Sequence, residues 1–134
     1  MLAEKPEGYT PPSLGYPLLE WYGHALLNKV NEGRLTLEKL VEVTSVNGAK
    51  AFGFYPRKGS NLPGTDADFT ICDVKREWIA DSSRIYAKSG FSSYHGKKFK
   101  GKVTHTVVRG NVVMVEGEVI GKPGWGKFVT PDQQ

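Results

Sequence analysis

Histidine and cysteine are scarce in this chain of 134 residues, which contains His24, His95, His105 and a single cysteine, Cys72. One cysteine excludes an internal disulfide, and its place in an alternating apolar segment predicts a buried, unreactive thiol. The histidines show no His-x-His spacing and no arrangement typical of a nucleophilic triad. We interpret His24 as a helix-face residue and His105 as a packing or surface residue on a strand. We therefore expect no catalytic and no metal-binding residues here.

Long apolar runs are also missing. No stretch of 18 or more apolar residues occurs, and the first 16 residues, with their prolines and glycines, lack the apolar core of a signal peptide. The unpaired cysteine suits a reducing compartment. We expect a cytoplasmic protein without a membrane partner.

The composition is that of an ordinary globular domain, with 39% hydrophobic and 24% charged residues. The net charge of +4 raises the question of nucleic-acid binding, because Lys97, Lys98, Lys100 and Lys102 form a dense basic run around Phe99. Such a run is more typical of a solvated loop or strand edge. We expect no nucleic-acid partner.

The first half of the chain has helical periodicity. Residues 1–16 predict an extended loop, and from Pro17 apolar residues recur at helical spacing until Gly33 ends the first helix. Thr36 is placed to cap a second helix. Asn47 is placed to cap a third, which we expect to end at Gly53.

After residue 58 the period changes from 3.6 to 2. Ala67, Phe69 and Ile71 alternate with polar residues, as in a strand with one buried face. Residues 103–108 and 112–115 flank Arg-Gly-Asn, which predicts a tight hairpin, and a third strand is expected at 118–120. Between them, residues 74–101 show no firm period and predict a strand, a loop and a short crossing.

Two further features of this half concern single side chains. Asp66 and Asp68 stand two apart, and we interpret them as turn residues that shape the reversal into the strand rather than as metal ligands. The tail, residues 122–129, is rich in turn residues. We expect it to lie across another surface, anchored by Trp125 and Phe128.

Ordered motifs along residues 2–129 resemble the last third of the metal-dependent cyclic amidohydrolases, the dihydroorotase, hydantoinase and allantoinase group. Residues 12–20, PSLGYPLLE, resemble the active-site loop after the Asp-His-Ala-Pro-His motif of the eighth barrel strand, although Leu18 stands where glycine is common. Residues 26–41 resemble the helix-turn-helix that closes the barrel. Residues 47–53, NGAKAFG, resemble the Asn-Pro-Ala-Lys-x-Phe-Gly helix, with Gly48 in place of proline. The segments PRKG (56–59), GTDAD (64–68) and VVRG (107–110) resemble the strands and connections of the sandwich.

The resemblance implies an α+β fold, an incomplete TIM-barrel amidohydrolase. Residues 1–58 would be the loop and helices at the end of the barrel, and 59–134 the C-terminal half of a small antiparallel β-sandwich. Met1 would fall just after the last metal-binding aspartate. The family's zinc ligands are therefore not expected in this chain, which would hold no cofactor and be inactive alone. The backbone of Leu14 and Gly15 is expected to touch the cyclic substrate.

Two functions stay open. The chain is either the C-terminal part of an enzyme that hydrolyses a cyclic amide, such as dihydroorotate, a hydantoin or allantoin, or a non-catalytic, self-associating scaffold derived from that fold. In either case its helices and sheet would leave several hundred Å² of apolar surface bare in a monomer, which forfeits on the order of 10 kcal/mol. We expect a homo-oligomer or a separate barrel subunit as partner.

Overall fold

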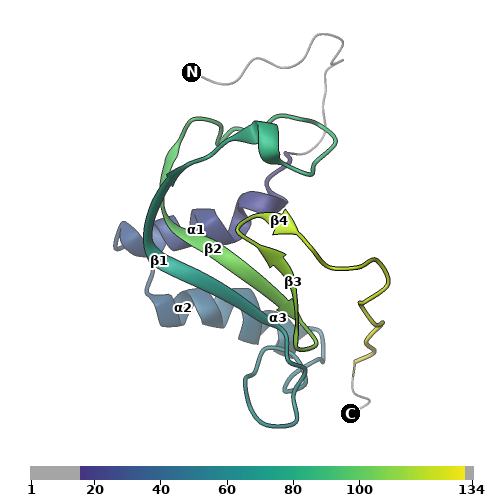
Figure 1. The fold of residues 1–134 in the computed structure, drawn as a ribbon. Helices are drawn as coiled ribbons and strands as arrows, with labels where there is room; N and C mark the ends of the chain where they lie inside the picture. The colour runs from purple at the N-terminus through teal and green to yellow at the C-terminus, as the bar shows by residue number, and fades with distance from the viewer. Residues whose placement is uncertain (1–15, 132–134) are drawn as a thin grey trace.

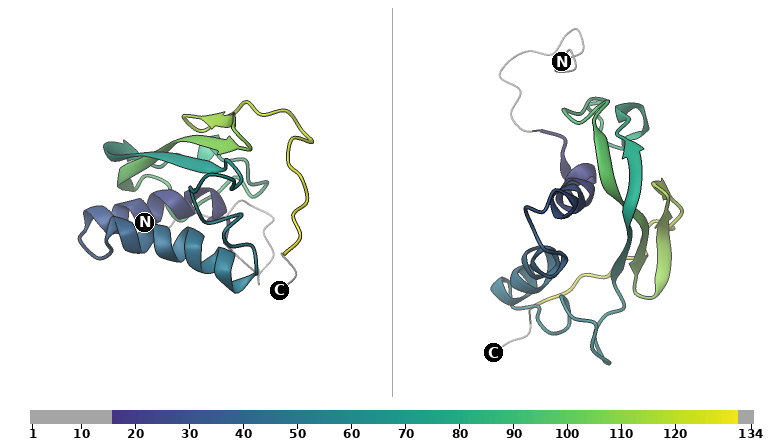
Figure 2. Two further views of the ribbon diagram at one scale, coloured as in Figure 1. Left: turned by 90° about the horizontal axis from the view of Figure 1, so that it is seen from below. Right: turned by 90° about the vertical axis from the view of Figure 1, so that its left-hand side faces the viewer.

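Helices lie against one face of a four-stranded antiparallel sheet in the computed structural model, which describes residues 16–131 (Figure 1). The helices come first in the chain and the strands follow, so the α+β class is confirmed. Figure 2 shows the helical layer on one side of the sheet. The division at residues 58 and 59, and the membership of this sheet in a sandwich, stay predictions.

The first helix begins with a 3₁₀ turn, η1 (Leu19–Trp21), and continues as α1 (Tyr22–Asn31). It ends as expected at Gly33, whose φ of 71° lies in the left-handed region that favours glycine. The helix packs chiefly on strand β2 (Lys98–Val108). A Cβ built on Gly101 would lie 2.7 Å from the Cβ of Leu27, so this glycine permits the close approach of helix and strand.

The second and third expected helices form one continuous helical segment. It runs from α2 (Leu37–Val41) through a π-helical turn, η2 (Glu42–Val46), into α3 (Asn47–Ala51). The predicted cap at Thr36 is confirmed, because its Oγ1 accepts the N–H of Lys39 at 3.1 Å.

The predicted cap at Asn47 is wrong. Its backbone is helical, with φ −66° and ψ −41°, and its side chain donates instead to Glu42 Oε1 at 3.4 Å. Gly48 places no steric limit on the residue before it, unlike the proline usual in the family. Nothing at this point therefore interrupts the helical turns that precede Asn47.

The sheet is a meander in the order β1-β2-β3-β4. Its other strands are β1 (Phe69–Ile79), β3 (Asn111–Val115) and β4 (Glu118–Val119). The predicted reversals are confirmed: Arg109-Gly110 has φ of 49° and 79°, and Glu116-Gly117 has φ of 53° and 94°. Positive φ at both residues matches the twist of the flanking strands in a two-residue hairpin loop.

Strand β1 departs from its predicted pattern. Phe69 and Ile71 are 40% and 48% exposed, so the expectation that they form a buried face is wrong. The reason is position, because β1 is at the edge of the sheet while α1 packs mainly on β2. Cys72 is only half-buried, and burial raises the pKa of its thiol. Asp73 accepts the N–H groups of Lys75 and Arg76, which makes an irregularity that hides the strand period beyond it.

The tail follows its prediction in part. The indole N–H of Trp125 donates to the carbonyl of Val108 at 2.9 Å, which ties the tail to the end of β2. Phe128 is 92% exposed, so its predicted role as an anchor is wrong for the surfaces that the structure describes. Farther on, the tail reaches the turn after α3, where a Cβ on Gly53 would lie 3.2 Å from Pro131. None of the helices within residues 16–131 is both long and apolar enough to span a bilayer.

Candidate functional site

A stack of aromatic rings joins the start of α1 to the end of β1. Trp21 and Trp78 lie nearly parallel with centroids 5.6 Å apart, and Phe99 stacks on Trp78 at 5.4 Å. Tyr94 meets Phe99 edge-on at 5.3 Å. Trp21, Phe99 and Ala80 are buried and form the core. Two cavities border this core, and Trp78 contributes to the lining of both.

The larger cavity, about 590 Å³, lies between the start of α1, the end of β1 and the β3–β4 turn. Its apolar lining includes Ile79, Met114 and Val119, and its polar lining includes Lys102 and Glu116. Lys102 Nζ is paired with Glu116 Oε2 at 2.9 Å, so this cation is already neutralised by a neighbour. The cavity has the size of a small-molecule site, and its one lysine is already paired.

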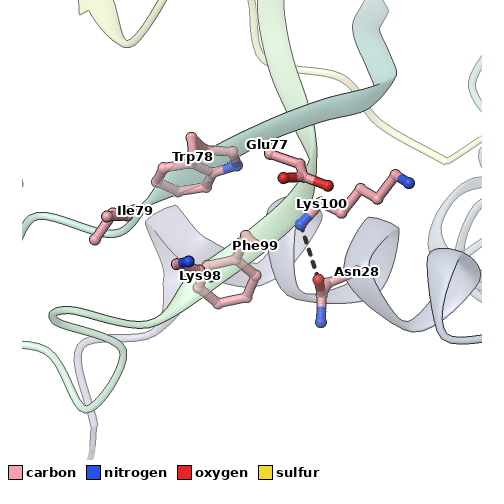
Figure 3. Close-up of a pocket in the computed structure, with 7 residues that line it drawn as sticks. All are labelled: Asn28, Glu77, Trp78, Ile79, Lys98, Phe99 and Lys100. Atoms are coloured by element: carbon pink, nitrogen blue, oxygen red, sulfur yellow. Dashed lines mark hydrogen bonds between the residues drawn. The ribbon is translucent and has the colours of Figure 1, made fainter.

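The smaller cavity, about 410 Å³, opens beside α1 and is lined by both basic and aromatic residues (Figure 3). Asn28 Oδ1 accepts the backbone N–H of Lys100 at 2.9 Å and so holds β2 to the helix. Lys98 and Lys100 are exposed and form no ion pair within residues 16–131. The first three lysines of the basic run, Lys97, Lys98 and Lys100, are thus solvated as predicted, whereas Lys102 is largely buried and paired with Glu116. From Lys98 on, the run lies on an inner strand rather than on the predicted loop or strand edge, and the expectation of no nucleic-acid partner stays a prediction.

His24 is a packing residue on α1. Its Nδ1 accepts the backbone N–H of Val103 at 3.2 Å, and its ring lies edge-on to Trp21 at 6.3 Å. Burial, with a smaller effect of the Lys102 charge, lowers the pKa of His24 to about 4. The imidazole is therefore neutral at pH 7 and holds α1 against β2.

The other two histidines make contacts of their own. His95 Nδ1 accepts the N–H of Ser82 at 3.1 Å and lies 3.8 Å from Asp81 Oδ1, near η3 (Ser82–Arg84). His105 Nδ1 lies 3.0 Å from Thr104 Oγ1 on β2. Within the part of the chain that the structure describes, no three His, Cys, Asp or Glu side chains are grouped so that they could hold a metal ion.

Asp66 and Asp68 are held by cations rather than left open. Asp66 pairs with Lys58 at 2.9 Å, Arg57 at 3.2 Å and Arg109 at 3.4 Å. Asp68 pairs with Lys58 and accepts the backbone N–H of Arg109 at 2.7 Å. The hydrogen bond from Lys58 is the main cause that lowers the pKa of Asp66. These contacts fasten the loop before β1 to the β2–β3 turn.

Comparison with known proteins identifies the family. Residues 20–113 match the model of the Amidohydrolase family. The chain belongs to the amidohydrolase family. The predicted recognition is confirmed, since the relatives and structural neighbours of this amidohydrolase-family chain are named dihydroorotase and hydantoinase.

Two curated relatives show the extent of the match. A dihydroorotase of Pyrococcus furiosus is 48% identical over 115 residues, which are 86% of this chain and 27% of the relative. An L-hydantoinase of Paenarthrobacter aurescens is 44% identical over 105 residues, which are 78% of this chain and 23% of the relative. This amidohydrolase-family chain therefore spans about a quarter of the length of these relatives.

Solved structures give the same picture. The L-hydantoinase (dihydropyrimidinase) from Arthrobacter aurescens superposes with a TM-score of 0.76 and 42% identity, over 80% of this chain and 24% of that one. A D-hydantoinase superposes with a TM-score of 0.75 and 34% identity, over 84% of this chain and 25% of that one. The helices and the meander are thus arranged as in part of a hydantoinase.

The predicted substrate contacts, Leu14 and Gly15, lie outside the described residues. Glu20 is the nearest described residue in the sequence that makes a long-range polar contact. Its carboxylate accepts the backbone N–H groups of Tyr86 and Ala87. This role of Glu20 is not predictable from the sequence. A glutamate in an apolar helical stretch gives no local signal that its partners come from a loop 66 residues later.

Proposed function

We propose that this chain acts as the C-terminal part of an enzyme that hydrolyses the C–N bond of a cyclic amide. The observation that carries the proposal is the 48% identity to a dihydroorotase along 86% of this chain. The hydantoinases that match at 44% and 38% support the broader class of ring substrates. Dihydroorotate or a hydantoin would therefore be the substrate, and allantoin belongs to the same proposed reaction type.

In this proposal zinc and the groups that react belong to the rest of the enzyme. The side chains described here do not fit a zinc site: His24 Nδ1 is engaged by Val103, and Asp66 and Asp68 are engaged by cations. The matched segment is about a quarter of the relatives, so the remaining three quarters would supply the ligands. This chain alone would be inactive.

The exposed apolar side chains support a partner of this kind. Leu37 and Val41, one turn apart on α2, are 43% and 52% exposed, and Leu19 in η1 is 90% exposed. A soluble monomer rarely presents many such side chains together without a binding function. We propose that a barrel portion, in the same chain or in a separate subunit, covers these helices.

Reconstitution tests the proposal. The full chain is mixed with the Pyrococcus furiosus dihydroorotase from which the matched 115 residues have been removed, in the presence of zinc. Ring opening of dihydroorotate and of a hydantoin is followed, with each component alone as control. We expect activity only in the mixture. A zinc-loaded, stable complex that opens neither ring, or an active isolated chain, would contradict the proposal.

A second candidate is a non-catalytic, self-associating module. The observation in its favour is the outer edge of β1, which pairs with no other described strand and presents Phe69 and Ile71 to solvent. Exposed strand edges of this kind promote association. The solution mass and zinc content of the purified chain distinguish the two candidates. A stable, metal-free oligomer that does not bind the barrel portion supports the non-catalytic module.

A further inference from the structure

The larger cavity has a wall that suits an apolar ring. Its volume of about 590 Å³ is within the range of small-molecule sites. The start of α1, the end of β1, the loop after η3 and the β3–β4 hairpin together supply its apolar lining: Trp21, Trp78, Ile79, Ile85, Met114 and Val119. Aromatic rings attract one another, and a methionine sulfur packs favourably on a ring edge. This lining therefore favours a planar aromatic ring.

The two cations of the lining are already neutralised. Lys102 Nζ lies 2.9 Å from Glu116 Oε2, and Arg84 Nη2 lies 2.6 Å from Glu118 Oε1. Glu116 also pairs with Arg76 at 2.6 Å. An anionic ligand would have to break one of these ion pairs, because the lining offers it no free cation.

The two remaining carboxylates of the lining are held by backbone N–H groups. Glu20 accepts the N–H of Tyr86 at 2.9 Å and that of Ala87 at 3.0 Å. Asp81 Oδ1 accepts the N–H of Ser83 at 2.9 Å, and this hydrogen bond lowers the pKa of Asp81. Neither carboxylate is left as an open counter-ion for a cationic ligand. The charges around the cavity thus favour a neutral ligand.

His24 supplies a hydrogen-bond donor at the cavity. Its Nδ1 accepts the N–H of Val103 at 3.2 Å and therefore carries no proton. Burial, with a smaller effect of Lys102, lowers the pKa of His24 to about 4, so the neutral ring has its proton on Nε2 at pH 7. Within residues 16–131 this Nε2–H has no hydrogen-bond partner.

A second donor without an acceptor belongs to Trp21, three residues before His24. Its side chain is 6% exposed, and its indole N–H has no partner among the residues that the structure describes. Buried polar groups in proteins are nearly always hydrogen-bonded, so such a group calls for an explanation. The lining thus contains two N–H groups that lack an acceptor, which a ligand with an acceptor atom would complement.

We propose that the larger cavity binds a neutral, planar ring that carries a hydrogen-bond acceptor, such as a carbonyl oxygen, for the Nε2–H of His24. The apolar lining selects the ring, the paired charges select its neutrality, and the unpartnered donor selects the acceptor. The inference goes beyond the proposed function, because it concerns binding by this chain and needs no ring opening.

Benzamide, benzoate and benzamidine test this ligand class, because they are similar in shape and differ in charge. Each is titrated into the full chain at pH 7.5, and proton–nitrogen NMR spectra are recorded. Benzamide should shift the indole N–H signals of Trp21 and Trp78 with a Kd on the order of 1 mM. Trp125, which does not line the cavity, is the internal control. Benzoate and benzamidine should bind at least roughly tenfold more weakly.

The hydrogen bond to the ligand has its own signal in these spectra. Benzamide should move the Nε2–H resonance of His24 downfield, because a proton donated to an acceptor is deshielded. This measurement leaves His24 in place and so does not disturb its contact with Val103. An unchanged His24 resonance at saturating benzamide would refute the assigned donor.

A pair of variants tests the location of the site. Val119→Phe places a ring against the cavity from β4 and should weaken benzamide binding at least roughly fivefold. The control is Val112→Phe, the same change at an exposed residue of β3 outside the lining, and it should leave the Kd unchanged. Both positions are more than 40% exposed, so both variants should keep the fold.

Three results would overturn the inference. They are no shift of the Trp78 signal at about 10 mM benzamide, binding of benzoate or benzamidine as tight as that of benzamide, and equal binding of benzamide to Val119→Phe and the wild type. The ligand series alone decides the first two. Ring opening by the reconstituted mixture bears on the proposed function only, so the failure of one proposal is distinguishable from the failure of the other.

Discussion

The imidazole of His24 lies edge-on against the indole of Trp78, with centroids 4.8 Å apart and an interplanar angle of 71°. Together with the hydrogen bond from the Val103 N–H, this contact places a titratable group inside the junction between α1 and the sheet. The junction is also where η1 carries Glu20 and Trp21. The contacts of this junction therefore hold α1 against the sheet.

Protonation of His24 should loosen this junction in mild acid. The pKa of His24 in the folded chain is about 4, below its ordinary value of 6.5, so the unfolded chain binds the proton first. The stabilisation is complete above pH 6.5 and is lost as the pH falls towards 4. Partial exposure reduces the effect, and we expect a loss of about 1–2 kcal/mol between pH 7.5 and 5.

Urea unfolding of the wild type and of His24→Gln at both pH values measures this loss. The glutamine variant does not titrate, so its free energy of unfolding should change less between the two pH values. The carboxylates whose pKa values are lowered on folding are common to both proteins, so their contributions to the pH dependence cancel in the comparison. Equal pH dependence of the two proteins would show that His24 does not carry the effect.

The close contact at Gly101 gives a second prediction. Gly101→Ala places a Cβ 2.7 Å from Leu27 Cβ on a backbone with φ of +97°, so both overpacking and strain oppose it. We expect a loss of about 3 kcal/mol in the free energy of unfolding. Thermal and urea unfolding give the value.

Gly48→Ala is the matched control, because a Cβ there meets nothing within 4 Å and the residue lies inside α3. Its higher helix propensity should stabilise the chain by about 0.5–1 kcal/mol. Both variants replace glycine by alanine, so their comparison separates the effect of close packing at Gly101 from the effect of helix propensity at Gly48. A Gly101→Ala variant as stable as the wild type would mean that α1 does not approach β2 as closely as described.

Local chemistry explains which elements the sequence could predict. The turns at Arg109-Gly110 and Glu116-Gly117 and the cap at Thr36 depend on neighbours within four residues, and all were predictable. The exposure of Phe69 depends on which strand is at the edge of the sheet, a property of the whole topology. Alternation alone therefore predicted a strand correctly and its buried face wrongly.

Long-range partners explain what could not be predicted in the site. Glu20 finds its partners 66 residues away, and Asn28 binds β2 at a separation of 72 residues. The residues next to Glu20 and Asn28 in the sequence form no pattern that predicts these contacts. The family resemblance, in contrast, rests on motifs spread along the chain, and it was confirmed because many weak local signals agree in order.

The ion cluster before β1 gives the last prediction. Asp68→Ala removes the acceptor for both Lys58 and the Arg109 backbone N–H, and leaves the Lys58 ammonium with Asp66 as its remaining partner. Burial raises the pKa of Asp68, but the hydrogen bonds from Lys58 and the Arg109 N–H lower it by more. The pKa of Asp68 is therefore below its ordinary value. We expect the variant to lose about 1–2 kcal/mol in the free energy of unfolding.

The pH dependence and a control on β1 make this test specific. Because the pKa of Asp68 is lowered on folding, its contribution is present above the ordinary pKa of 3.8 and disappears as the pH falls below it. The difference between wild type and variant should therefore shrink in acid. Glu77→Ala removes an exposed carboxylate that forms no ion pair within residues 16–131, and it should change stability by less than about 0.5 kcal/mol. Equal losses in the two variants would show that the cluster does not fasten the loop to the β2–β3 turn.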